Sequence, residues 1–520
     1  MKTTRWLALV GLFALGLLVT LFAQAQGDGQ ATRVNLNKAV AELEKQVQEQ
    51  VDTGGLPGVA IAVVHQGNVV YAKGFGVREM GKSDKVDADT VFQLASVSKP
   101  ISASVVAALI GDGKITWDSK LNDIDPAFEM YDPYVTREIT IRDMYSHRSG
   151  LPAHAGDKLE DLGYSRAQVL HNLRYQRPGS RFRSQFAYTN FGITEGSVAA
   201  AGAYGLDWAD ASEQKLYKQL GMNSTSSRFK DFEARANKAV NHVLRDGKWM
   251  HQSQRNPDAQ SPAGGVSSSA NDMAKWMRMQ VEQGKFEGKP IVAAAPLAET
   301  QFPQMITGVN RMTGMPTFSG LGWNVNYDAE RRVWLTHSGA FALGAATNVI
   351  LVPAEQLGIV VLTNGEPIGV AEGLAQIFID NALYGKPTLD WMTLYKQAFK
   401  NPETIGLEKY ADYSRPPSPG TPAMKNQAYI GTYGDNTLVG DIQIIERGGK
   451  LALVIGPQKM TLPLAHYDRD TFTYETVGEN AAGLAGVTFT MGADGNAMSV
   501  VIENLNVQGQ GSFNRVDAEK

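Results

Sequence analysis

The chain has 520 residues, a hydrophobic fraction of 43%, a formal net charge of −4 and no cysteine. This length is sufficient for two or three domains with full cores. The mild acidic surplus argues against nucleic acid or an anionic membrane surface as a partner, and the lack of cysteine excludes disulfides, thiol catalysis and thiolate metal sites.

The first 25 residues have the features of a secretory signal. Lys2 and Arg5 supply the positive start, residues 6–22 form an apolar run, and Ala23-Gln24-Ala25 provides a small-x-small cleavage site. We therefore expect residues 1–25 to be a signal peptide, the mature protein to be periplasmic or secreted, and no stable membrane insertion after cleavage. An uncleaved anchor is the alternative, because about 17 apolar residues approach the length that spans a bilayer.

The mature chain is predicted to open with an amphipathic helix and a hairpin. Apolar residues recur every three or four positions between Leu36 and Val51, and Asn35 can cap the helix. Two runs rich in β-branched residues, 59–64 and 69–76, flank a glycine turn. These runs predict two antiparallel strands.

The stretch from Ser96 to about residue 305 is typical of helices and loops, after which strand patterns return. They cover residues 321–325, 333–336, 347–353 and 358–362, and a helix is expected at 370–383. We expect the early hairpin to join these late strands in one antiparallel sheet, flanked by the first and last helices. The central helices would form a lobe beside it, which makes an α/β (α+β) fold over residues 33–388 with Ser96 in the cleft.

The character of the chain changes after residue 388. Residues 389–427 combine a helix with a proline-rich linker, because several prolines there cannot continue a helix or a sheet interior. Short alternating segments separated by glycine turns then predict a small antiparallel β-barrel domain at 428–517. We expect this barrel either to cap the cleft or to drive assembly into a homo-oligomer.

The first of three motifs that carry chemistry is Ser96-Val97-Ser98-Lys99. A spacing of three residues places Ser96 and Lys99 on one helix face. A serine hydroxyl becomes a nucleophile when a neighbour takes its proton, and a lysine desolvated by the fold can do so. At a helix start the Ser96 N–H is also free to bind a developing oxyanion. Taken alone, each residue has a plainer interpretation, as a helix cap and as a solvated lysine.

The other two motifs are Tyr188-Thr189-Asn190 and His337-Ser338-Gly339. A phenol beside an ammonium can ionise and pass a proton to a leaving group, and the Asn190 amide can hold a lysine or a substrate amide. The third motif lies on a predicted strand, where Gly339 would leave room for a substrate backbone alongside it.

The three motifs in this order resemble the active-site set of serine β-lactamases and penicillin-binding proteins. The form with Tyr188-Thr189-Asn190 is similar to the class C β-lactamase branch, which includes esterases, D-amino-acid peptidases and carboxypeptidases. Residues 146–152 and 261–268 also resemble loops of that family. The resemblance covers roughly residues 35–385, and the tail resembles the lipocalin-like domain found behind some of these hydrolases.

The resemblance implies that Ser96 forms an acyl-enzyme and that Lys99 and Tyr188 share the acid and base work, with the choice of general base left open. It also implies an oxyanion hole formed by the N–H groups of Ser96 and Ala340. His337 stands where true β-lactamases usually have lysine. A mostly neutral imidazole loses a charge-assisted contact to a carboxylate, worth roughly 1.5–3 kcal/mol. Efficient β-lactamase activity is therefore not expected.

These observations predict an exported serine hydrolase that acts on amide or ester bonds, foremost as a peptidase on small or D-residue-containing peptides. An esterase or weak β-lactamase is the alternative, and a non-catalytic ligand-binding or partner-binding protein is the alternative from another class. No cofactor and no metal are expected. His147 and His154 lack a carboxylate–histidine pattern, so loop hydrogen bonding is the expected role of both.

Overall fold

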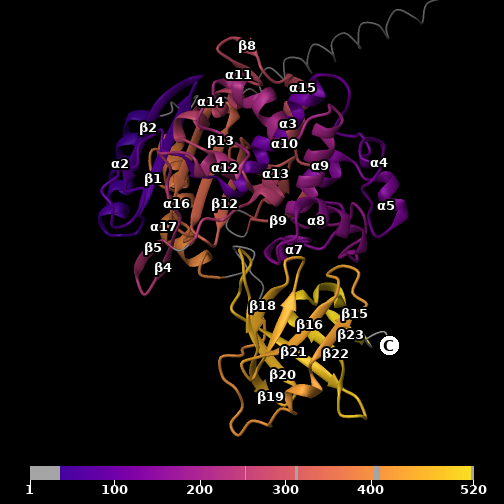
Figure 1. Ribbon diagram of the computed structural model, residues 1–520. Coiled ribbons are helices and arrows are strands. Elements are labelled where there is room, and N and C mark those ends of the chain that lie inside the picture. Colours follow the sequence, from indigo (N-terminus) through magenta and orange to yellow (C-terminus); the bar gives the residue numbers. More distant parts are fainter. Residues whose placement is uncertain (1–34, 252, 311–313, 402–409, 517–520) are drawn as a thin grey trace, which may run out of the picture.

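The computed structural model describes residues 35–251, 253–310, 314–401 and 410–516. The larger part of the molecule is built on an eight-stranded antiparallel sheet, and the smaller part on a nine-stranded one (Figure 1). The predicted signal peptide lies outside the described residues, so export stays a prediction. Within those residues, no helix combines the length and the apolar character needed to cross a membrane.

The large sheet joins the two ends of the first domain, as predicted. Its strands, in order across the sheet, are β2 (Asn68–Gly76), β1 (Gly58–His65), β14 (Leu357–Thr363), β13 (Ala345–Val352), β12 (Val333–Phe341), β11 (Asn324–Tyr327), β10 (Pro316–Ser319) and β9 (Met305–Val309). β1 pairs with β14, with Val59 opposite Thr363. The sequence did not predict β9 and β10. β9 is the edge strand, is largely exposed and lacks an apolar alternation, and β10 beside it has only four residues.

Two helices cover one face of this sheet. The predicted first helix is α2 (Leu36–Asp52), whose N-cap Asn35 accepts a hydrogen bond from the Lys38 N–H, and the predicted last helix is α16 (Val370–Tyr384). Both helices lie on the same side of the sheet (Figure 1). They pack on each other and share one apolar cluster with the sheet. The opposite face is covered by α14 (Ala270–Val281), which contacts β1 and β14.

The central part of the chain consists mainly of helices, as predicted. The helices other than α14 are α3 (Ser98–Gly111), α4 (Leu121–Ile124), α5 (Pro133–Glu138), α6 (Ile141–Tyr145), α7 (Asp157–Asp161), α8 (Arg166–Asn172), α9 (Asn190–Gly202), α10 (Trp208–Ser212), α11 (Lys218–Leu220), α12 (Phe229–Glu233), α13 (Ser261–Gly264) and α15 (Ala294–Thr300). Three two-stranded ribbons interrupt them: β3 (Phe92–Gln93) with β6 (Ser267–Ser268), β4 (His242–Arg245) with β5 (Lys248–His251), and β7 (Lys285–Phe286) with β8 (Lys289–Pro290). Helix α3 is buried from Ser98 to Leu109, so it forms the centre of this lobe.

The second domain follows α17 (Trp391–Ala398). Its strands, in order, are β18 (Met460–Pro463), β17 (Lys450–Ile455), β16 (Ile442–Arg447), β15 (Gly431–Gly434), β23 (Ser512–Val516), β22 (Ala497–Ile502), β21 (Leu484–Met491), β20 (Thr471–Glu475) and β19 (Ala465–Asp468). Because β18 also contacts β20, the sheet curls into a nearly closed barrel, which confirms the predicted barrel-like fold. The sequence did not predict the four- and five-residue strands β15, β18, β19 and β23.

The barrel lies against the helical lobe beside α7 and α8 (Figure 1). The Asn172 amide donates to the Leu438 carbonyl over 2.9 Å, and the Gln510 amide donates to the Tyr175 carbonyl over 2.7 Å. The Asp161 carboxylate accepts hydrogen bonds from the loop between β20 and β21. The two domains are therefore joined by specific polar contacts as well as by the linker.

Candidate active site

Ser96 lies on a single 3-10 turn, Ala95–Val97, directly before α3. Ala95 adopts a left-handed backbone conformation with φ of 48°, which is unfavourable for a residue other than glycine. The Thr347 hydroxyl donates to the Leu94 carbonyl over 2.7 Å, so strand β13 holds this strained turn in place. Such strain is found where a structure must present a side chain at a set angle.

The Lys99 ammonium is fully buried and lies among three oxygens. Its Nζ is 2.7 Å from Asn190 Oδ1, 2.9 Å from the Ala263 carbonyl oxygen and 3.0 Å from Ser96 Oγ. In the neutral amine, two N–H groups suffice for Asn190 and Ala263, and the lone pair is then left for the Ser96 hydroxyl. The surroundings of Lys99 thus orient it as an acceptor for the serine proton.

The charge of Lys99 is governed by burial. Desolvation lowers its pKa to about 7, and the opposing effect of Asp157 and the reinforcing effect of Arg255 are smaller. An appreciable share of the neutral amine is therefore present near pH 7.

Tyr188 completes the group around Ser96. Its hydroxyl donates to Ser96 Oγ over 2.8 Å, and its ring centroid lies 4.6 Å from Lys99 Nζ. Burial raises the pKa of Tyr188 above its usual range, so the phenol keeps its proton at neutral pH. Tyr188 is thus arranged as a proton donor.

Two histidines hold the Tyr188 loop. The His147 ring lies 4.8 Å from the Tyr188 ring, and its Nδ1 accepts a hydrogen bond from the Thr189 N–H. The backbone N–H of His154 donates to the Tyr188 carbonyl over 2.8 Å. Both histidines therefore make the loop hydrogen bonds that the sequence predicted. Their packing around the phenol ring was not predicted. Across the described ranges, no group of three or more metal-binding side chains is arranged to hold an ion.

His337 is a neutral, buried residue of β12. Burial and the nearby Lys99 lower its pKa to about 3. Its Nδ1 lies 2.7 Å from the Ser338 carbonyl oxygen, and a donor at Nδ1 leaves Nε2 as an acceptor. The Ser338 hydroxyl accepts from the Asn348 amide over 3.0 Å. At position 337 the site therefore offers a neutral acceptor and no cation.

Gly339 brings β12 against the nucleophile turn. A Cβ at this position would lie 2.2 Å from the Leu94 carbonyl oxygen and 3.1 Å from the Ser96 nitrogen. The space that the sequence assigned to a substrate backbone is occupied by this turn, because β12 packs directly on it. The glycine thus sets the distance between β12 and Ser96.

Replacing Gly339 with alanine should lower the free energy of unfolding by about 1–3 kcal/mol, since the new methyl group would overlap backbone atoms that cannot rotate away. Chemical denaturation with matched thermal scans measures this. Gly202→Ala is the control, because a Cβ at Gly202 meets no atom within 4 Å. Equal stability of the two variants would contradict the close packing of β12.

The three motifs meet at one cavity of about 310 Å³. Its lining includes Ser96, Tyr188, Asn190, His337, Ser338 and Ala340 from the predicted site, together with His154, Asp157, Arg255, Gln260, Gly264, Asn324, Phe341, Phe399, Glu479 and Asn480. Lys99 lies directly behind Ser96, and Gly339 lies against the turn. The structure therefore brings together all the predicted site residues.

Asp157 and Arg255 are functional candidates that the sequence did not reveal. Asp157 Oδ2 accepts from the Asn190 amide over 2.8 Å, which orients Asn190 Oδ1 toward Lys99. The Arg255 guanidinium lies 2.8 Å from the Glu160 carboxylate and stacks on the Phe341 ring. Neither residue belongs to a local motif, so only their spatial neighbours identify them.

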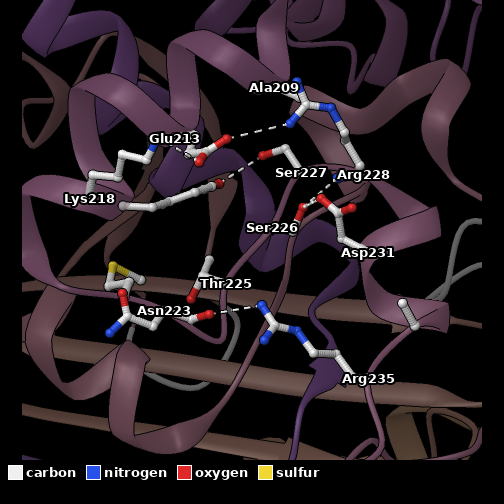
Figure 2. A pocket seen from close by; sticks show the side chains of 13 residues that line it. Ala209, Glu213, Lys218, Asn223, Thr225, Ser226, Ser227, Arg228, Asp231 and Arg235 are labelled. Carbon is white, nitrogen blue, oxygen red and sulfur yellow. Dashed lines mark hydrogen bonds and ion pairs between the residues drawn. The ribbon is translucent and has the colours of Figure 1, made fainter.

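A second cavity, of about 420 Å³, lies among residues 209–235 (Figure 2). Its charged groups already face one another: Arg228 lies beside Glu213, the Ser226 hydroxyl donates to Asp231, and Arg235 donates to the Asn223 carbonyl. A nucleophile paired with a buried base is absent from this lining. The chemistry is therefore concentrated at Ser96.

Comparison with known proteins matches two families along the chain. A family model described as Beta-lactamase matches residues 43–383, and one described as Domain of unknown function (DUF3471) matches residues 415–515. Unguisins hydrolase ungD' of Aspergillus campestris is 25% identical over 416 residues, which cover 76% of this chain and 76% of that protein. Penicillin-binding protein 4 of Amycolatopsis lactamdurans is 27% identical over 319 residues, which cover 60% of this chain and 81% of that protein.

A solved structure shares the fold. The octameric penicillin-binding protein homologue from Pyrococcus abyssi superposes with a TM-score of 0.58 at 18% identity, covering 89% of this chain and 98% of that chain. The Beta-lactamase model alone spans well over half of the sequence. On these grounds the chain belongs to the Beta-lactamase family.

Proposed function

We propose that the protein is a serine hydrolase that forms an acyl-enzyme on Ser96 and cleaves amide or ester bonds. The observation that carries the proposal is the position of Ser96 Oγ, 3.0 Å from the Lys99 amine and 2.8 Å from the Tyr188 hydroxyl. Lys99, a base with a pKa of about 7, and the protonated phenol of Tyr188 then act on the same oxygen, Ser96 Oγ.

In the acylation step, neutral Lys99 takes the Ser96 proton while Oγ bonds to the substrate carbonyl carbon. The backbone N–H groups of Ser96 and Ala340 are proposed to bind the oxyanion. When the bond to the leaving group breaks, Tyr188 gives its proton to the departing nitrogen or oxygen and regains one from Lys99. Water then attacks the acyl ester, and Lys99 passes the water proton back to Ser96 Oγ, which restores the resting enzyme.

Among substrates we favour small peptides, including those with D-residues, and esters second. His337 is neutral, and Arg255 is occupied by the carboxylates of Glu160 and Glu479. The described cavity lining therefore offers no readily available cation for a substrate carboxylate. This supports slow hydrolysis of β-lactams, since β-lactams carry such a carboxylate.

A panel of D-alanyl and L-alanyl p-nitroanilides, p-nitrophenyl esters and nitrocefin tests the proposal on the full chain. We expect turnover of an anilide or ester with a kcat/KM at least about tenfold above that for nitrocefin, since a lost charge-assisted contact costs about that much. Covalent labelling by a fluorophosphonate probe should accompany turnover. A folded protein that is silent on the whole panel and unlabelled would instead be a non-catalytic binder.

A further inference from the structure

The barrel domain contributes side chains to the cavity that contains Ser96. Glu479 and Asn480, in the loop between β20 and β21, line this cavity together with Ser96 and Tyr188. The structure thus forms one wall of the cleft from a separate domain.

This loop is anchored tightly to α7. The Asp161 carboxylate accepts hydrogen bonds from the N–H groups of Glu479 and Asn480, over 2.9 and 3.1 Å, and from the Asn480 amide over 2.8 Å. At Gly478, whose φ is 86°, a Cβ would lie 2.1 Å from Asp161 Oδ1. The close approach requires glycine and leaves the loop little freedom.

The Glu479 carboxylate in turn holds the chain that follows β12. It accepts hydrogen bonds from the N–H groups of Ala342, over 2.6 Å, and Leu343, over 3.4 Å. Arg255 Nη1 lies 3.6 Å from Glu479 Oε1, and each of these two side chains is about one-tenth exposed. Losing this carboxylate would leave Arg255 with Glu160 as its remaining ion-pair partner and would leave the two N–H groups without their acceptor. An unsatisfied donor in a buried place is costly.

The segment that Glu479 holds is part of the site. Ala342 is two residues beyond Ala340, whose N–H is the proposed oxyanion donor, and five beyond His337. The Phe341 ring is covered by the Arg255 guanidinium, with the guanidinium carbon 4.5 Å from the ring centroid. The end of β12 is therefore held from the sheet on one side and from the barrel on the other.

We propose that the barrel domain completes the active site: Glu479 is a positioning residue that fixes the end of β12 relative to Ser96, and Asn480 forms the wall that restricts the cavity to short acyl groups. This inference rests on the proposed function and deepens it, because it names the substrate class as small acyl esters or amides rather than long-chain or polymeric ones.

Glu479→Gln in the full chain tests the positioning role. The amide keeps one acceptor but loses the charge facing Arg255 and places an N–H₂ against a backbone donor. We expect kcat for p-nitrophenyl acetate to fall by about tenfold or more, with KM changed less than about twofold, because the oxyanion donor shifts while binding contacts stay. Glu475→Gln, an exposed change on β20, is the matched control.

All rates are divided by the number of sites titrated with a fluorophosphonate, so that loss of folded protein does not lower kcat. Should Glu479→Gln give too little folded protein, Asp161→Asn loosens the same loop without touching Arg255 and should produce the same fall in kcat. Equal kcat values per titrated site in Glu479→Gln (or its substitute) and Glu475→Gln would overturn the positioning role.

Asn480→Ala tests the wall. Asp161→Asn is the control, because it weakens the same anchor without shortening Asn480, and it should leave the ratio of kcat/KM for p-nitrophenyl octanoate to that for the acetate unchanged. In Asn480→Ala we expect this ratio to rise by about tenfold, since the shortened side chain opens space for added methylenes. An unchanged ratio would overturn this role. Failure of the unchanged chain to be labelled would instead overturn the proposed function and this inference with it, so the two failures are distinguishable.

Discussion

Ser96→Ala should abolish turnover of every substrate in the panel and all labelling by a fluorophosphonate. Removing the nucleophile of a serine hydrolase lowers kcat by about 10⁶-fold, and what is left comes from oxyanion stabilisation and binding alone. Steady-state rates and intact-mass spectrometry of the labelled protein measure the loss. The fold should survive, because the Ser96 hydroxyl faces the cavity and its partners, Lys99 and Tyr188, keep other contacts.

Ser102→Ala is the matched control for this loss. Ser102 lies on α3, which follows the turn that carries Ser96. Its hydroxyl donates to the Lys99 carbonyl and accepts from the Tyr145 hydroxyl, away from the cavity. Its removal should lower stability and leave labelling at Ser96 intact. Full labelling of the Ser96→Ala protein would show that another residue is acylated and would reject the assignment.

Lys99→Met should lower kcat/KM by about 10²–10⁴-fold, the usual contribution of a positioned base. For the unchanged chain, the base must be neutral to accept a proton, so kcat/KM should fall about tenfold per pH unit below about 7 and level off above it. The same profile in Lys99→Met should lose this step. Lys99→Arg should be equally impaired, because a guanidinium does not deprotonate near neutral pH.

Tyr188→Phe separates the acid from the base. A phenol that keeps its proton is needed to protonate a departing amine, whereas p-nitrophenolate leaves without help. We therefore expect anilide turnover to fall far more than p-nitrophenyl ester turnover. If instead the step near pH 7 vanished in Tyr188→Phe and persisted in Lys99→Met, the roles of base and acid would be reversed.

Sequence patterns predicted most of the first domain because its elements carry strong local signals. The period of α2 and the apolar runs of β1, β13 and β14 express burial along a regular element, and the exposed Asn35 marks the start of α2 by a local hydrogen bond. The signal fails where burial is partial: β9 is largely exposed, and β15 and β18 have only four residues each. Four residues are too few to establish an alternation.

The site residues that lie in local motifs were predicted, and those without a motif were not. Ser96, Lys99, Tyr188 and His337 were identified because each stands in a short motif whose residue types suit acyl transfer. Gly339 was correctly predicted to allow a close approach, but the group that approaches it is the Leu94 carbonyl and not a substrate backbone. Leu94 comes from a segment more than 200 residues away. Asp157, Arg255 and Glu479 belong to no motif, and nothing local distinguishes them from surface charges. Their burial beside one another exists only in three dimensions.

The pairing of β1 with β14 also has a consequence during synthesis. Val59 pairs with Thr363, which is synthesised about 300 residues later. Nearly all of β1 is apolar and buried in the finished sheet. Until β14 leaves the ribosome, the β1 edge of the nascent hairpin has no strand to pair with. Unpaired apolar strand edges favour aggregation. Production should therefore depend on chaperones that shield the emerging amino-terminal segment, and slower translation should raise the yield of soluble protein only if that protection is present.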